Sequence, residues 1–175
     1  MKSIQLLISI FILIVLQACG GPSDKQLISA AYNGKTKTLE QAIIDGKDVN
    51  TTSTKQGIPL LSYAAGAGHT PTVSMLLMHQ AEINRTDNNG WTALHFAASN
   101  GHLETLDLLT AMGADLNLKT SEDWTALMYA VFANHTEVVK RLIFRGADKS
   151  FATADGLTAA EIAKSKGFHD LLAFL

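Results

Sequence analysis

The stretch GWTALHFAASNGHLETLDLLTAMGADLN, residues 90–117, carries the pattern that decides the fold of this 175-residue chain. A short apolar segment is followed by a glycine, and a longer amphipathic segment is followed by a second glycine and a polar loop. Apolar residues at helical spacing between such turns predict a pair of helices. The pattern recurs every 33 residues, which indicates stacked repeats rather than the folded pocket of an enzyme.

Two sets of positions mark this period along the chain. The first set is Gly57, Gly90, Asp123 and Gly156, and the second is His69, His102, His135 and Phe168. The stretches that begin at the first set share one pattern: GIPLLSYAA, GWTALHFAA, DWTALMYAV and GLTAAEIAK. Working backwards, GKDVN at 46–50 aligns with QAEIN at 80–84 at a spacing of 34, so an earlier unit begins near Asp24. The chain therefore contains five units, the last of which ends with the chain.

The repeated unit resembles the ankyrin repeat, and the third unit is the closest match. The residues that stand where the family places those residue types are Asp87, Gly90, Thr92, Leu94, His95, Ala97, Ala98, Gly101, His102, Leu108, Leu109, Gly113, Ala114, Asp115 and Asn117. The resemblance implies an all-α ankyrin-repeat solenoid, with helix-turn-helix units at about 24–51, 52–84, 85–117, 118–150 and 151–175 joined by hairpin loops.

The same residues explain why the units must stack. Glycines follow both helices of a unit, where the chain needs a left-handed residue, and Asn134 replaces one of them. Small first-helix residues that allow close approach are Ala64, Ala65, Ala97, Ala98, Ala130 and Ala163, and the apolar stripe of the second helices is Leu76, Leu77, Leu108, Leu109, Leu142 and Ile143. No unit buries that stripe alone, so each is stable only against its neighbours.

The histidines form a row that a metal site could explain, but the repeat favours a structural role. The resemblance implies that His69, His102 and His135 bridge backbone groups at the start of each second helix, and that His95 pairs with Thr92. Packed helices lie about 10 Å apart, which is too wide for shared Zn²⁺ ligation. The sequence contains no GxSxG, HExxH, paired CxxC or phosphate-binding glycine loop. We expect no catalytic residues, no metal, no cofactor and no small-molecule substrate.

The first 19 residues do not follow the repeat pattern. Lys2 gives a basic start, residues 4–16 form an apolar run, and Leu16-Gln17-Ala18-Cys19 follows. The run is too short for a comfortable transmembrane helix and indicates a secretion signal. The tetrad resembles the bacterial lipobox, which implies that residues 1–18 are a signal peptide and that Cys19, the only cysteine, carries lipid. The alternatives are an ordinary signal peptide with a chance cysteine and an uncleaved anchor.

The segment between anchor and array is very short. Residues 19–23 would be the lipidated cysteine and a short tether, and Ser23 with Gln26 resembles a capping box that opens the first helix at Asp24. Four extended residues reach only about 14 Å, so the array would work close to the membrane surface. Gly20 rather than aspartate after Cys19 resembles the outer-membrane class of lipoprotein. We therefore expect a lipid-anchored protein at the outer membrane, facing the periplasm.

Charge argues against nucleic acid as a partner. The full chain has 14 basic and 16 acidic residues and a net charge of −2, and loss of Lys2 with the signal would make it −3. A mildly acidic domain has no electrostatic basis for binding DNA or RNA.

A protein partner is expected on the concave side of the array, as the resemblance implies. The position after each hairpin glycine or aspartate holds Ile58, Trp91, Trp124 and Leu157, and the exposed end of each first helix holds Tyr32, Gly66, Ser99 and Phe132. The polar rim would be Lys55, Gln56, Asn88, Asn89, Ser121, Glu122, Ala154 and Asp155. Stacked aromatic residues at a partly exposed position are typical binding hot spots. Alternatively, each large residue packs against the neighbouring hairpin.

The last unit lacks the histidine at Phe168 and ends in the apolar residues Phe174 and Leu175. Terminal repeats normally present polar faces to water. Either this tail folds back on the array or it forms a second contact surface.

These features lead to a specific functional hypothesis: a membrane-tethered lipoprotein that neutralises an envelope-targeted toxin such as a lipase, as an immunity or inhibitor protein. A second hypothesis is a scaffold or protector of a periplasmic enzyme. A third, catalysis or metal binding, has no motif in its favour.

Overall fold

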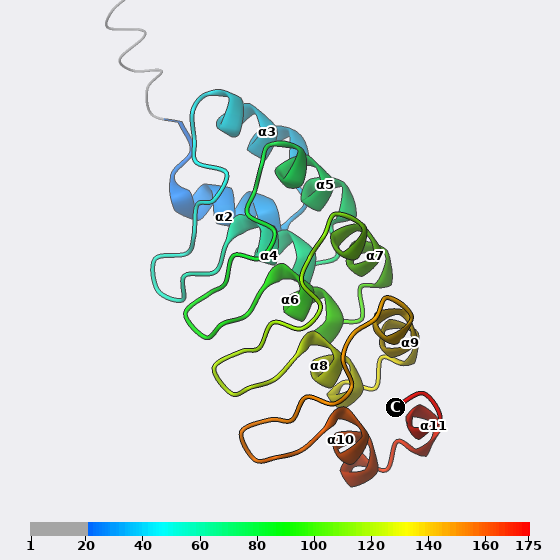
Figure 1. Cartoon of the computed structure of the whole chain (residues 1–175). Coiled ribbons are helices and arrows are strands. Elements are labelled where there is room, and N and C mark those ends of the chain that lie inside the picture. The colour runs from blue at the N-terminus through cyan, green and yellow to red at the C-terminus, as the bar shows by residue number, and fades with distance from the viewer. Residues whose placement is uncertain (1–20) are drawn as a thin grey trace, which may run out of the picture.

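The computed structural model describes residues 21–175, which form ten helices arranged as five antiparallel pairs (Figure 1). The inner helices are α2 (Asp24–Tyr32), α4 (Leu60–Gly66), α6 (Ala93–Ser99), α8 (Ala126–Phe132) and α10 (Ala159–Lys166). The outer helices are α3 (Thr36–Ile44), α5 (Thr70–Met78), α7 (Leu103–Ala111), α9 (Thr136–Phe144) and α11 (His169–Leu172). The expected signal peptide and Cys19 lie outside the described residues.

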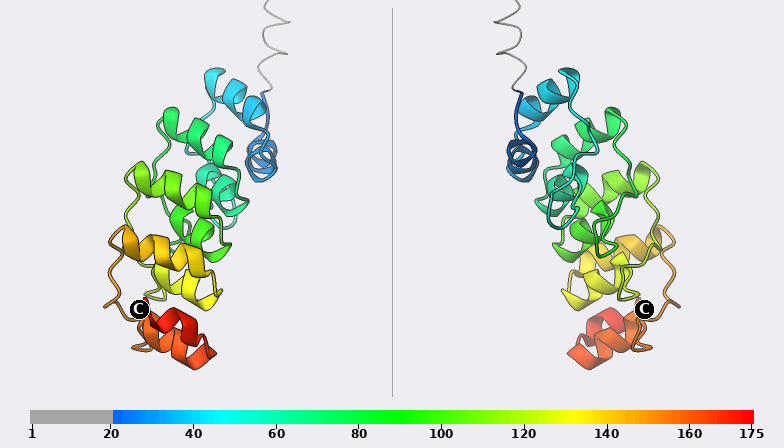
Figure 2. Two further views of the ribbon diagram at one scale, coloured as in Figure 1. Left: turned by 90° about the vertical axis from the view of Figure 1, so that its right-hand side faces the viewer. Right: turned by 90° about the vertical axis from the view of Figure 1, so that its left-hand side faces the viewer.

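The pairs stack into a two-layered solenoid. Each inner helix packs on the next inner helix, and in the outer layer α3 packs on α5, α5 on α7 and α7 on α9. Figure 2 shows the array from its outer-helix side and from its hairpin side. Long loops project beside the inner helices, and within residues 21–175 only two isolated bridges, Thr52 with Pro59 and Ala152 with Thr158, give them strand character. The predicted all-α solenoid is confirmed.

The core runs through the whole array as one cluster of buried residues. All six of the predicted small alanines are buried, and so are Leu76, Leu109 and Leu142 of the outer helices. Their neighbours Leu77, Leu108 and Ile143 are partly buried against the same cluster. The outer helices are thus amphipathic, and their apolar stripes are covered by the adjacent units, as expected of a solenoid.

Left-handed residues end the helices where the sequence predicts them. Gly101 follows α6 with φ 76°, and Asn134 replaces the equivalent glycine with φ 58°. A Cβ on Gly101 would lie 2.7 Å from the His135 ring, so this turn needs glycine for space as well as for its φ. Gln80 also has a positive φ, 66°, at a turn where other units have glycine. The chain therefore tolerates one strained residue after α5.

The histidine row is structural, as predicted. The Nε2 atoms of His69 and His102 donate to the carbonyl oxygens of Tyr32 and Gly66, each at 3.0 Å. His135 Nε2 donates in the same way to Ser99 O at 3.0 Å. Each ring therefore satisfies a carbonyl at the end of the preceding unit's inner helix, one of the groups that a helix leaves unpaired.

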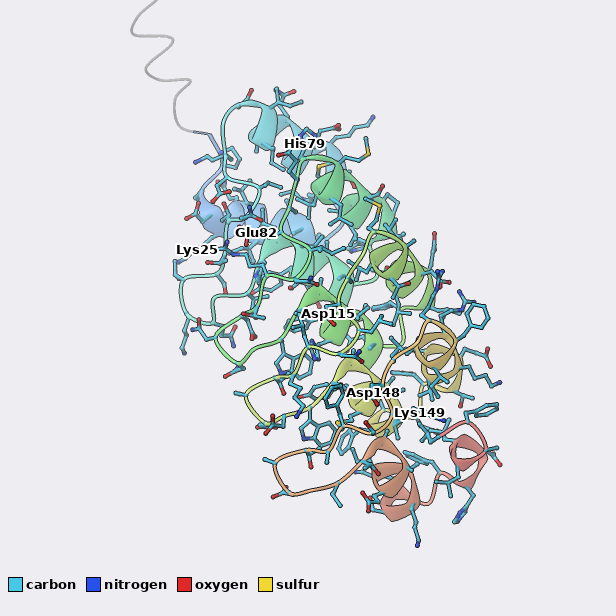
Figure 3. All side chains as sticks on the ribbon, in the orientation of Figure 1. Lys25, His79, Glu82, Asp115, Asp148 and Lys149 are labelled. Carbon is cyan, nitrogen blue, oxygen red and sulfur yellow. The ribbon has the colours of Figure 1, made fainter. Side chains whose placement is uncertain are left out.

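A second ladder of asparagines links the loops that follow the outer helices. The side-chain oxygens of Asn50, Asn84 and Asn117 accept the backbone N–H groups of Glu82, Asp115 and Asp148. Figure 3 shows these three acidic residues following one another along the array. The ladder fixes the register of neighbouring units because each bond crosses from one unit to the next.

His95 and Thr92 pair as the resemblance implied. The Thr92 hydroxyl donates to His95 Nδ1 at 2.8 Å, and His95 Nε2 donates to the carbonyl of Trp124 at 3.3 Å. Burial lowers the pKa of His95 to about 4, so the ring is neutral at pH 7. Met128 occupies the equivalent position in the next unit, where Thr125 caps α8.

Both ends of the described chain pack on the array. The N–H of Ser23 donates to Gln26 Oε1 at 2.8 Å in the predicted capping box, and α2 begins at Asp24. At the other end Leu175 packs against the core, and Lys149 Nζ donates to Phe174 O at 3.2 Å. The apolar tail therefore folds back on the array.

Candidate protein-binding surface

The hairpins hold the residues that follow their tips in fixed positions. Asp87 Oδ1 accepts the N–H groups of Asn89 at 2.9 Å and Trp91 at 2.8 Å. At the equivalent position in the next hairpin, Thr120 Oγ1 accepts the N–H of Trp124 at 3.3 Å. A short polar side chain thus closes each loop onto its own backbone, so that the tryptophan leaves the loop in a defined direction.

Both tryptophans stack on aromatic side chains of the inner helices. The Trp91 ring lies 5.0 Å from Phe96 and 4.2 Å from Tyr129, measured between ring centres. The Trp124 ring lies 5.0 Å from Tyr129 and 5.6 Å from Phe132. We call Trp91, Phe96, Trp124, Tyr129 and Phe132 the aromatic cluster. It joins the third and fourth units, and Tyr129 is the ring that connects the two tryptophans.

Both tryptophans lie against aromatic side chains of the inner helices and are also partly exposed, and their role in binding stays a prediction. Each ring packs against side chains of the array, yet Trp91 and Trp124 are only half buried and Phe132 is 47% exposed. Contacts with neighbouring rings restrict how far each tryptophan can rotate. Rigid, partly exposed rings suit protein recognition because little side-chain freedom is lost when a partner binds.

Phe96 and Tyr129 are surface residues that the sequence reasoning missed. Together with Tyr63 they fall at intervals of 33 residues, so a search for aromatic residues at a repeated position would have found them. Lys166 was missed as well: its Nζ lies 3.8 Å from the centre of the Phe132 ring. This cation–π contact places a positive charge at one end of an otherwise apolar cluster.

The predicted polar rim forms a continuous ridge. Backbone hydrogen bonds join successive hairpin tips, from Asn88 N to Gln56 O at 3.0 Å, from Ser121 N to Asn89 O at 2.9 Å, and from Ala154 N to Glu122 O at 3.3 Å. The side chains of all eight rim residues are exposed. The ridge therefore borders the aromatic cluster with polar groups that stay in contact with water.

The remaining predicted residues lie to either side of the aromatic cluster. Tyr32, 59% exposed, belongs to the first unit and borders a hollow that it shares with Ile58. Leu157 is exposed on the last hairpin. The predicted surface is thus one face along the array, with the aromatic cluster in its centre and a hollow towards the first unit.

Two adjoining hollows open on this face. One, of about 200 Å³, is mainly apolar and is lined by Tyr32, Ile58, Ser62, Tyr63, Gly66, Phe96 and Asn100. The other, of about 290 Å³, is lined by Gln56, Ile58, Asp87, Asn89, Trp91 and Phe96. The two hollows share Ile58 and Phe96. Because Phe96 also belongs to the aromatic cluster, the hollows and the cluster form one continuous surface.

A second group of exposed apolar residues lies elsewhere. Ile44, Met78 and Phe144 end their outer helices, and Met112 directly follows α7. Phe144 is 83% exposed. Because the four residues occupy equivalent or adjacent positions of successive units, they mark the edge of the array at which the outer helices end. We call them the outer-edge row.

Residues 21–175 contain no group of three His, Cys, Asp or Glu side chains that could hold a metal ion. Within the same range no helix is long and apolar enough to cross a membrane.

Comparison with known protein families agrees with the repeat pattern. A family model for ankyrin repeats in three copies matches residues 27–120, and a model for many copies matches residues 98–143. No curated protein matches the chain. Ankyrin repeats in general mediate protein–protein interaction. The first match alone spans more than half of the sequence, and the chain therefore belongs to the ankyrin-repeat family.

Proposed function

We propose that this chain is a membrane-tethered lipoprotein of the bacterial envelope that binds a protein partner, and that it acts as an immunity or inhibitor protein against an envelope-targeted toxin such as a lipase. The observation that supports partner binding is the aromatic cluster, held rigid at the centre of the inner face and bordered by the exposed polar ridge. An apolar centre with a polar rim is a normal interface layout.

The position of the N-terminal end is consistent with a tether. A Cβ on Gly21 would lie 3.4 Å from Lys47 Cε, so the chain enters the array beside the end of α3. This is the edge that carries the outer-edge row. A membrane near that edge would meet the exposed side chains of Ile44 and Met78. Such an orientation suits an inhibitor that meets its target at the membrane surface.

The binding claim is tested by removing both tryptophans. We expect Trp91→Ala with Trp124→Ala to weaken capture of the partner from an envelope extract at least about 30-fold, because a hot-spot aromatic residue contributes roughly 2 kcal/mol. The full chain serves as bait, and bound proteins are identified by mass spectrometry. Circular dichroism should show that the helical content is kept.

The control is Met78→Ala with Phe144→Ala, which also removes two exposed apolar side chains but from the outer-edge row. This variant should capture the partner as the unmodified chain does. Unchanged capture by the tryptophan variant would contradict the proposal, and its unfolding would show that the tryptophans belong to the core. A captured toxin supports inhibition, whereas a captured resident enzyme supports the role of a protector.

The anchor is tested separately with Cys19→Ser. We expect this variant to accumulate as an unprocessed precursor and to lose labelling by a clickable fatty acid, because Cys19 is the only cysteine available for acylation. Labelling that survives the substitution would overturn the lipid anchor.

A further inference from the structure

The second unit has small residues on the inner face where the third and fourth units have larger ones. Ile58 stands at the position of Trp91 and Trp124, Ser62 at that of His95 and Met128, and Gly66 at that of Ser99 and Phe132. These three residues all line the 200 Å³ hollow. The hollow therefore arises from differences between repeats and not from the common architecture of the unit.

Aromatic rings form much of its wall. Tyr32 comes from α2, Tyr63 from α4 and Phe96 from α6, so three successive inner helices contribute. Asn100 Nδ2 donates to Gly66 O at 2.6 Å and fixes the amide at the rim. None of the seven lining residues is charged. The lining therefore favours an uncharged aromatic ring over an acidic or basic side chain.

Ser62 supplies a polar group without a partner. The residue is 1% exposed, and its Oγ makes no hydrogen bond. At the same position in the next unit the His95 ring is satisfied by Thr92 and by the carbonyl of Trp124. A buried hydroxyl that lacks a partner is unfavourable, and a ligand that supplies a hydrogen-bonding group removes that cost.

We propose that this hollow is a side-chain pocket for a tyrosine of the partner protein. The phenol ring packs among Tyr32, Tyr63 and Phe96, and its hydroxyl pairs with Ser62 Oγ after the serine rotates about its Cα–Cβ bond, because that oxygen is closed to solvent in the free chain. The pocket rests on the proposed binding function, which it makes more specific. It adjoins the aromatic cluster through the shared residues Ile58 and Phe96. One segment of the partner therefore contacts the cluster and places a tyrosine in the pocket.

The test uses p-cresol, the side chain of tyrosine, as a probe. We expect p-cresol to bind the detergent-solubilised full chain with millimolar affinity, and 4-methylanisole, which lacks the hydroxyl proton, to bind about fivefold more weakly. Ligand-detected NMR measures both affinities. In Ser62→Ala the affinity for p-cresol should fall by the same factor, since the hydroxyl partner has been removed.

Ile58→Trp provides a matched control, because it gives the second unit the residue that the third and fourth units already have. The larger ring should fill the pocket and abolish p-cresol binding in the same detergent, with circular dichroism unchanged. Retained binding in this variant would overturn the assignment of the site.

Equal affinities for the two probes, or an unchanged affinity in Ser62→Ala, would contradict a tyrosine and indicate a purely apolar occupant. Failure of the pocket is distinguishable from failure of the proposed function. In the first case p-cresol does not bind while capture through Trp91 and Trp124 persists. If the proposed function fails, the tryptophan variant still captures the partner, whether or not p-cresol binds to the pocket.

Discussion

At the scale of single residues, His95 shows how burial changes the chemistry of a repeated position. The equivalent residue one unit later is Met128, which does not titrate, and both residues are 1% exposed. Burial holds the pKa of His95 at about 4, although its ring donates to the carbonyl of Trp124. The imidazole is therefore a neutral hydrogen-bonding group in the core.

The free energy of unfolding should consequently depend on pH through His95. An unfolded histidine has a pKa of 6.5, so between pH 6.5 and 4 the unfolded chain binds a proton that the folded chain does not. The stability is fully present above pH 6.5 and falls as the pH drops to 4, by about 3 kcal/mol in total. Urea denaturation at several pH values measures this loss.

His95→Met is the matched variant, because the next unit shows that methionine fits this position. The free energy of unfolding of this variant should lack the loss between pH 6.5 and 4 that His95 causes. The loss that comes from protonation of carboxylates should be the same in both proteins. Identical pH profiles for the two proteins would contradict the shifted pKa.

At the scale of elements, the turn after α6 packs against the following unit. Gly101 ends α6, and the ring of His135 packs directly over it while donating to Ser99 O. The turn after an outer helix is less constrained: a Cβ on Gly113 would meet nothing within 4 Å, although φ there is 90°. The two kinds of glycine are thus required for different reasons.

A pair of substitutions separates these reasons. Gly113→Ala should cost about 1 kcal/mol of stability, because only the left-handed backbone is strained. Gly101→Ala should cost roughly 2 kcal/mol, since the new methyl group also displaces His135 from its hydrogen bond. Thermal or urea denaturation measures both values. Equal losses would show that the histidine moves aside freely.

The helix pairs and their turns could be predicted from the sequence, because their signals are local. Ser23 with Gln26 marked the start of α2, and Asn134 marked the end of α8. The packing of Trp91 could not be predicted, because it depends on Tyr129, which lies in the next unit. In a solenoid, the exposure of a side chain depends on the neighbouring unit as well as on its own. It therefore cannot be predicted from the sequence of one unit.

At the scale of the whole molecule, contacts between units connect only neighbours. The helices pack within their own pair and on the adjacent units, and the histidine and asparagine ladders also step from one unit to the next. Stability is therefore distributed along the array. The core of the described chain is one continuous cluster, but each unit contributes its own part of it and packs on its neighbours.

Deletion of one internal unit tests this. Removing residues 85–117 should leave a shorter folded protein with the same ellipticity per residue and a lower denaturation midpoint. A deletion of residues 85–101 alone should unfold a much larger part, because it leaves an outer helix without its inner partner. Complete unfolding after the 85–117 deletion would contradict a modular solenoid.

The sequence by itself determined the repeat, its period, the family, and the structural role of the histidines, because the same local contacts recur in every unit of a solenoid. Only the tertiary structure decided how the units differ at the inner face. It stacked Trp91 and Trp124 on one tyrosine, and it left a hollow beside Ser62 where the other units are filled. The contact of Trp91 with Tyr129 and the hollow beside Ser62 both involve side chains of different units, and their shape depends on volumes that meet only when the units stack.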